Sequence, residues 1–89
     1  MPRAEVLYSG YVQGVGFRFT ARNVAARYAV TGYVKNLPSG GVAVIVEGQQ
    51  SEIEAFLAEL GREMSDYVEN AQIDWRPETG EFRAFTVKY

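Results

Sequence analysis

Residues 4–36 read AEVLYSGYVQGVGFRFTARNVAARYAVTGYVKN, and their pattern is the strongest indication of the fold. Residues 4–12 are rich in β-branched and aromatic side chains that alternate loosely, which predicts a strand. Apolar residues then recur at helical spacing, with Thr20 as the expected N-cap. That helical face consists of Ala21, Val24, Ala25, Tyr28 and Ala29. Residues 32–36 predict a second strand, so the stretch forms a β-α-β unit with two parallel strands.

The rest of the chain adds a hairpin partner, a second helix and two further strands. Residues 37–41 predict a turn, and residues 42–48 predict a third strand with apolar side chains on both faces, which favours a central position. Ser51 and Glu54 have the spacing of a capping box at the start of a helix. The apolar face of this helix consists of Ile53, Phe56, Leu57, Leu60 and Met64. We expect a polar loop at residues 66–70, then strands at residues 71–76 and 82–89.

This order of elements predicts an α+β sandwich, with two helices on one face of a mostly antiparallel sheet. The ferredoxin-like split β-α-β topology, β-α-β-β-α-β with a short fifth strand, is its natural arrangement. A chain of 89 residues has the size of one small domain, so we treat residues 1–89 as a single unit.

The composition excludes several classes of enzyme. The chain has neither Cys nor His, which removes thiolate nucleophiles, histidine bases and the usual zinc ligands. Its formal net charge of −2 argues against a nucleic-acid binder. No apolar run reaches the roughly 18–20 residues of a membrane span, and no signal peptide is visible. We therefore expect a cytoplasmic protein without metal or cofactor.

The loop at residues 13–18, QGVGFR, connects the first strand to the first helix. Its glycines allow the backbone to present successive N–H groups, and the helix start adds unpaired donors and a positive dipole end. Arg18 offers a guanidinium fork to a phosphate or carboxylate. The loop thus suits an anion, although a tight turn with a solvated Arg18 explains the same residues equally well.

Asn36 closes the second strand, at the same edge of the sheet as this loop. With the third strand between them, Asn36 and the loop stand roughly 10 Å apart, a gap that a small anion bridges. Taken alone, an Asn before Leu37 and Pro38 is simply typical of a turn.

An Arg and an Asn without His or Cys suit a reaction that needs little proton transfer. Phosphoryl transfer depends mostly on positioning and charge stabilisation. A carboxylate leaving group needs no proton, because its conjugate acid has a pKa of about 4–5. The substrate class that fits this pair of residues is therefore an acyl phosphate.

Two motifs resemble those of the acylphosphatase family. Residues 10–18, GYVQGVGFR, match the pattern G-x-V-Q-G-V-x-F-R, and residues 32–36, GYVKN, open the second family motif. Gly40, Val42 and Gly48 continue the second motif, and residues 80–82 and 85–89 resemble the end of the family sequences.

The resemblance implies hydrolysis of the carboxyl–phosphate bond without a metal. It assigns phosphate binding to Gln13, Gly14, Val15, Gly16, Phe17 and Arg18, and it assigns Arg18 and Asn36 as catalytic residues. Tyr8 stands where the family usually has Leu, Ile or Val. Ala21 stands where some members carry a Thr that orients the Asn amide, which implies weaker support for Asn36.

Other interpretations remain at this point. A non-catalytic anion-binding module on the same fold and a carbamoyl-phosphate-specific domain are alternatives. Tyr8, Tyr11, Phe19 and Tyr33 could form a base-stacking platform, but the charge disfavours one, so we expect core or half-buried sheet aromatics. Trp75 is expected in the core. The expected partners are small acyl phosphates and the product phosphate, with no nucleic acid and no membrane, and the protein is expected to be a monomer.

Overall fold

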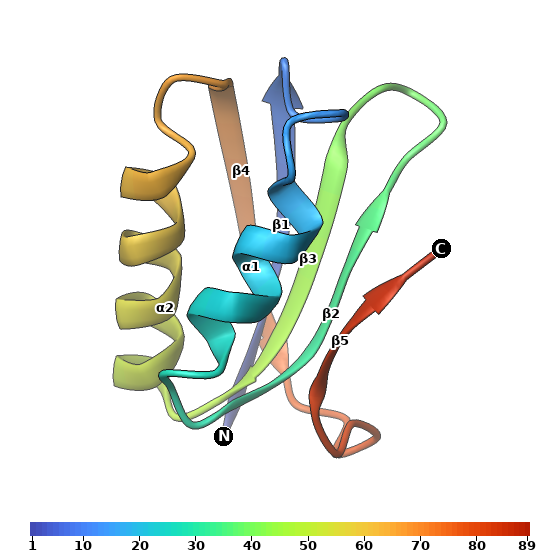
Figure 1. Cartoon of the computed structure of the whole chain (residues 1–89). Helices are drawn as coiled ribbons and strands as arrows, with labels where there is room; N and C mark the ends of the chain where they lie inside the picture. Colours follow the sequence, from blue (N-terminus) through green and yellow to red (C-terminus); the bar gives the residue numbers. More distant parts are fainter.

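The computed structural model describes all residues from 1 to 89, in the element order that the sequence predicts. The elements are β1 (Pro2–Gly10), α1 (Phe17–Ala25), β2 (Val30–Asn36), β3 (Val42–Gly48), α2 (Gln50–Glu63), β4 (Val68–Pro77) and β5 (Phe85–Lys88). Both helices cover one face of the sheet (Figure 1), which confirms the α+β ferredoxin-like sandwich. Neither helix has the length and apolar character that crossing a bilayer requires.

The five strands form one sheet in the order β4-β1-β3-β2-β5. All neighbouring pairs are antiparallel except β2 and β5, which run parallel. The central place of β3 is confirmed, and it separates β1 from β2 as the split topology requires. The connection from β1 to α1 and the turn from β2 to β3 therefore lie at the same end of the sheet (Figure 1).

The core lies between the helices and the sheet. Alternate residues of β3 point into it, because successive strand side chains face opposite sides. Helix α1 contributes Phe17, Ala21, Val24 and Ala25, and α2 contributes Ile53, Phe56 and Leu60. The expected apolar faces of both helices are thus largely confirmed, although Ala29 lies beyond the end of α1 and is exposed.

The opposite face of the sheet is closed at one end by a polar cluster around Glu47, which is only 3% exposed. Its carboxylate accepts hydrogen bonds from the Thr79 N–H and hydroxyl (both 2.9 Å), the Gly80 N–H (3.1 Å) and Arg3 (3.1 Å). Burial by itself would raise the pKa of Glu47, but these hydrogen bonds outweigh it and hold the pKa below its usual value. The cluster attaches the 78–81 segment to β1 and β3.

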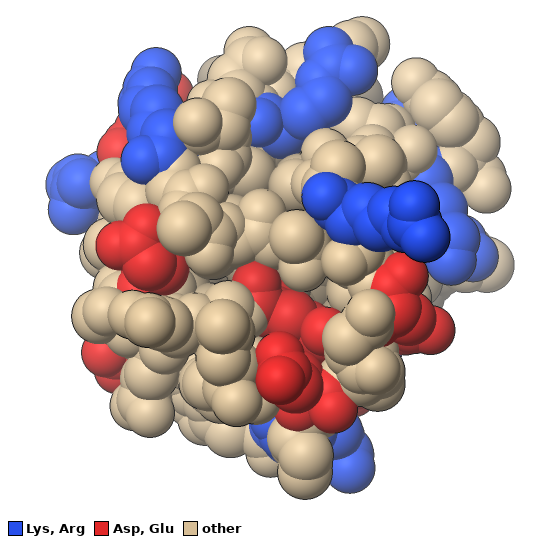
Figure 2. Space-filling model, turned by 90° about the horizontal axis from the view of Figure 1, so that it is seen from below, with Lys and Arg blue, Asp and Glu red and all other residues tan.

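The end of the molecule seen in Figure 2 carries a group of acidic side chains near its middle, with Lys and Arg side chains around it. Glu47 and Glu78 line a hollow there, and Arg3 pairs with Glu5, Glu47 and Glu81. This end lies away from the connection between β1 and α1.

Both helices begin earlier than predicted. Thr20 is not the N-cap of α1, because its N–H already donates to the carbonyl of Gly16 at 3.0 Å and the helix begins at Phe17. The left-handed conformation of Gly16 (φ +79°) turns the chain directly into the helix. The capping box is also wrong: α2 begins at Gln50, immediately after the short connection from β3, and Ser51 lies inside it.

The strand boundaries and three aromatic assignments also differ from the prediction. β1 ends at Gly10, β4 starts at Val68 within the expected loop, and β5 is limited to Phe85–Lys88. Trp75 is not a core residue: it is 44% exposed, because β4 is an edge strand that pairs with β1 alone. Tyr11 and Phe19 are likewise exposed, at 80% and 55%.

Candidate active site

The connection between β1 and α1 is an open loop of unpaired backbone donors. Gly14 and Gly16 have φ angles of +78° and +79°, which residues with a side chain rarely adopt. No N–H group of residues 14–19 donates a hydrogen bond within the chain. At the start of a helix, such groups together with the helix dipole favour a negatively charged ligand.

The first residue of α1 is firmly anchored. Phe17 is 2% exposed, and its ring packs against that of Tyr8 with centroids 4.9 Å apart. Tyr8 therefore replaces the aliphatic residue of the family motif with a larger packing partner, and its burial raises the pKa of its hydroxyl. This contact fixes the position of the residue that follows, Arg18.

Gln13 connects the loop to the neighbouring turn. Its side-chain amide donates to the carbonyl of Leu37 at 2.7 Å and to that of Gly41 at 2.8 Å. Both donor hydrogens are thereby used, so the Gln13 side chain has no donor left for a phosphate. Gln13 therefore connects the two loops that lie at this end of the sheet and stabilises their relative position.

The structure brings Arg18 and Asn36 together in one hollow of about 130 Å³. Its walls are formed by Val12, Gly14, Gly16, Phe17, Arg18, Phe19 and Asn36. Four of the six predicted phosphate-binding residues and both predicted catalytic residues thus meet there, whereas Gln13 and Val15 lie outside it. Arg18 comes from α1 and Asn36 from the end of β2, as the β-α-β crossover requires.

The charge of Arg18 is not neutralised by a carboxylate, since none of the ion pairs in the structure includes it. Its guanidinium carbon lies 4.8 Å from the centroid of the Tyr89 ring. An aromatic face orients a guanidinium without using its N–H donors. Arg18 therefore remains available to a phosphoryl group.

The amide of Asn36 also has no partner within the chain. It forms no side-chain hydrogen bond, and the position of the orienting Thr in some relatives is occupied by Ala21, which is fully buried. A free amide at the edge of the hollow has both a donor and an acceptor for a water molecule.

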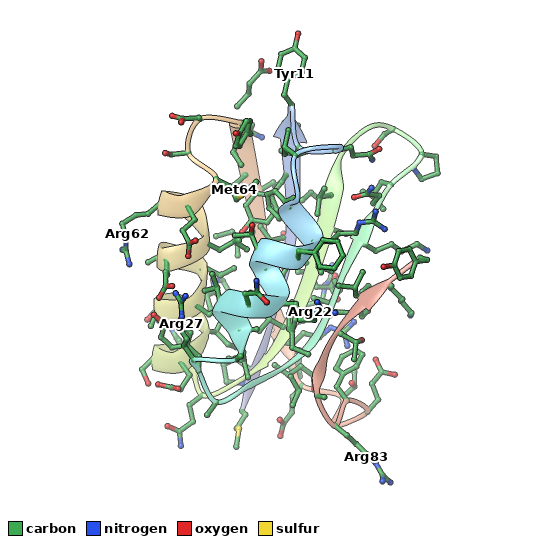
Figure 3. The ribbon with its side chains drawn as sticks, viewed as in Figure 1. Tyr11, Arg22, Arg27, Arg62, Met64 and Arg83 are labelled. Atoms are coloured by element: carbon green, nitrogen blue, oxygen red, sulfur yellow. The ribbon has the colours of Figure 1, made fainter.

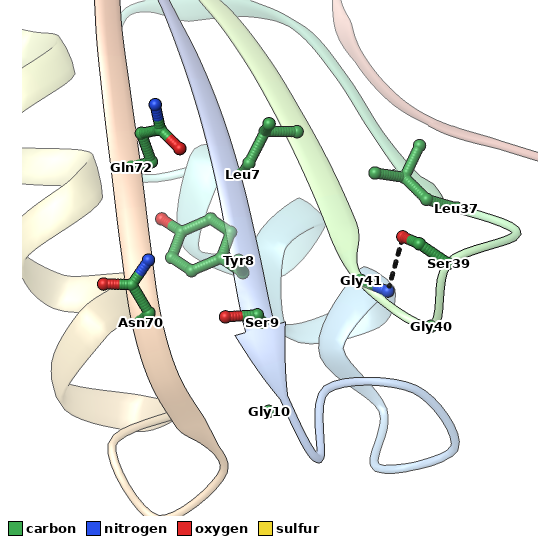
Figure 4. A pocket seen from close by; sticks show the side chains of 10 residues that line it. All are labelled: Leu7, Tyr8, Ser9, Gly10, Leu37, Ser39, Gly40, Gly41, Asn70 and Gln72. Atoms are coloured by element: carbon green, nitrogen blue, oxygen red, sulfur yellow. Dashed lines mark hydrogen bonds between the residues drawn. The ribbon is translucent and has the colours of Figure 1, made fainter.

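A larger hollow, of about 380 Å³, lies beside the same turn (Figure 4). It is lined by residues 7–10 of β1, residues 70 and 72 of β4, and residues 37 and 39–41. Leu7 is the exposed apolar side chain of its β1 wall. Neither Arg18 nor Asn36 contributes to this hollow, so its size does not make it the reactive site.

Sequence reasoning did not assign two residues beside Arg18 to this site. Phe19 follows Arg18 directly and forms part of the hollow. A correct prediction of where α1 begins would have placed Phe19 in the first turn, beside Arg18. Tyr89 is distant in sequence, and only the pairing of β5 with β2 brings it to α1.

Comparison with known proteins agrees with this site and fold. The model of the acylphosphatase family matches residues 4–87. The acylphosphatase of Roseiflexus sp. is 40% identical over 88 residues, 98% of this chain and 95% of that protein. That of Thermus thermophilus is 40% identical over 82 residues, 90% and 92% of the two chains. The crystal structure of acylphosphatase from Bacillus subtilis, 23% identical, shares the fold with a TM-score of 0.89 over 100% of both chains.

These matches extend over nearly the whole chain and confirm the resemblance carried by the two motifs. They agree with a site that holds free backbone donors, an unpaired guanidinium and a free amide. This protein therefore belongs to the acylphosphatase family, whose members are enzymes that hydrolyse acyl phosphates.

Proposed function

We propose that the hollow at the start of α1 hydrolyses the carboxyl–phosphate bond of acyl phosphates. In this proposal, Arg18 and the N–H groups of residues 14–18 hold the phosphoryl group, and Asn36 positions the attacking water. The observation that carries it is the meeting of Arg18 and Asn36 in one hollow with these free donors.

The reaction needs electrostatic stabilisation more than proton transfer. The water oxygen bonds to phosphorus as the bond to the carboxylate oxygen breaks, and the carboxylate leaves with the electron pair. The water proton passes to the phosphate product or to solvent, which gives carboxylate and inorganic phosphate. Negative charge on the three equatorial phosphoryl oxygens is stabilised by the guanidinium and the loop N–H groups.

The proposal includes neither a metal nor a cofactor, because Arg18 and the loop supply the positive charge. It also keeps the expectations of a single domain over residues 1–89, a cytoplasmic location, a monomeric state and small acyl phosphates as substrates. The net charge of −2 supports the absence of nucleic acid as a partner.

The test is hydrolysis of benzoyl phosphate by the purified protein in the presence of EDTA, with released phosphate as the readout. We expect hydrolysis at an undiminished rate after chelation. A folded protein that binds phosphate but releases none from benzoyl phosphate would contradict the proposal and indicate a non-catalytic binding module. Neither the site nor the relatives favour that module or a carbamoyl-phosphate-specific domain.

A further inference from the structure

We propose that Phe19 contacts the acyl group and gives the enzyme a preference for acyl phosphates with aromatic acyl groups. This inference rests on the proposed function of the hollow. Phe19 follows Arg18 in α1 and lines the same hollow as Asn36. Phe19 is 55% exposed, although an aromatic side chain gains most from burial.

Phe19 is the only exposed apolar side chain of the hollow. Val12 and Phe17 also line it, but they are 0% and 2% exposed and belong to the core. The two glycines have no side chain, and an added Cβ at either would meet nothing within 4 Å. Arg18 and Asn36 are assigned to the phosphoryl group and the water. Phe19 is therefore the residue of the hollow that can contact an apolar acyl group.

The direction of the reaction agrees with this assignment. The attacking and leaving oxygens lie roughly in line across phosphorus, so the acyl group leaves on the side away from the water. Asn36, which holds the water, comes from β2, whereas Phe19 comes from α1. The acyl group thus leaves on the side of phosphorus away from Asn36, and Phe19 belongs to the other of these two elements.

The ring of Phe19 is held in place by a cation–π contact with Arg22. The guanidinium carbon of Arg22 lies 5.1 Å from the ring centroid, three residues along the helix. Figure 3 shows Arg22 on α1. A ring that is already oriented loses little freedom when a ligand packs against it, so its contact energy is retained on binding. An aromatic acyl group offers the best matching surface.

The experiment compares kcat/KM for benzoyl phosphate and acetyl phosphate in the parent and in Phe19→Ala and Phe19→Tyr. In Phe19→Ala we expect the benzoyl-to-acetyl ratio to fall about two- to tenfold, the range that the loss of one aromatic contact covers. The acetyl phosphate value should stay close to that of the parent. Phe19→Tyr keeps the ring and should keep the ratio.

Tyr11→Ala is the matched control. Tyr11 is 80% exposed at the same end of the sheet and projects away from the body (Figure 3), but it does not line the hollow. We expect it to leave the ratio unchanged. Equal losses for both substrates in Phe19→Ala, or an equal fall in the ratio in Tyr11→Ala, would overturn the inference alone. A folded parent that hydrolyses neither substrate would overturn the proposed function and the inference with it.

Discussion

The guanidinium of Arg18 lies over the ring of Tyr89, 4.8 Å from its centroid. The contact joins the start of α1 to the residue that follows β5, two parts of the chain separated by 71 positions in sequence. No carboxylate pairs with Arg18, so the contact with this ring is what orients its guanidinium. The orientation of Arg18, the side chain that we propose binds phosphate, therefore depends on the pairing of the last strand.

Removing the ring should weaken substrate binding modestly. An exposed cation–π contact is worth about 0.5–1 kcal/mol, so we expect Tyr89→Ala to raise the inhibition constant of inorganic phosphate about two- to fivefold. Tyr89→Phe keeps the ring face and should restore the parent value. An inhibition constant in Tyr89→Phe as high as in Tyr89→Ala would show that the hydroxyl, rather than the ring face, supports Arg18.

Gln13→Ala should reduce stability and loosen the site together. It removes two hydrogen bonds that join the glycine loop to the carbonyls of Leu37 and Gly41. At roughly 1 kcal/mol for each hydrogen bond, the free energy of unfolding should fall by about 1–2 kcal/mol in urea denaturation. If Gln13 instead bound phosphate directly, the substitution would weaken phosphate binding without any loss of stability.

Substitution of Gly16 by Ala should act through the backbone. The position is open, but φ is +79°, where a Cβ is disfavoured by about 1–2 kcal/mol. We expect lower stability and lower activity, measured by urea denaturation and phosphate release. Gly61 is the control: it lies within α2 with nothing near an added Cβ, so Gly61→Ala should stabilise by about 0.5–1 kcal/mol. The same change in stability in Gly16→Ala and Gly61→Ala would refute the explanation by backbone conformation.

The Glu47 cluster predicts a loss of stability in acid. The pKa of Glu47 is lower in the folded state than in the unfolded state. The contribution of Glu47 to stability is therefore fully present above the unfolded pKa, about 4.3, and declines as the pH falls through the folded value. Glu47→Gln should lower the melting temperature at pH 7 and flatten its decline in acid. The control is Glu81→Gln, a change in a more exposed partner of Arg3, which is expected to alter stability by less than about 1 kcal/mol. An unchanged acid profile in Glu47→Gln would contradict this assignment.

The element order can be predicted from the sequence because it depends on local periodicity. The placement of Arg18 and Asn36 at the same end of the sheet can also be predicted, because it depends on the handedness of a β-α-β crossover. The helix starts cannot, since Gly16 and the short connection after Gly48 set them instead of the expected polar caps. Trp75 alternates like a core residue, and only the strand order reveals that β4 is an edge. The support of Arg18 by Tyr89 comes from a long-range pairing that no local pattern encodes.

The measurement that tests the central claim most directly separates phosphate binding from turnover in Asn36→Ala and Arg18→Ala. Loss of one preorganised polar group typically lowers kcat about 10²–10³-fold. We expect Asn36→Ala to lose this much kcat with benzoyl phosphate while it binds inorganic phosphate as tightly as the parent. Arg18→Ala should lose both activity and phosphate binding. Full turnover by a folded Asn36→Ala, or tight phosphate binding by Arg18→Ala, would contradict the roles assigned here.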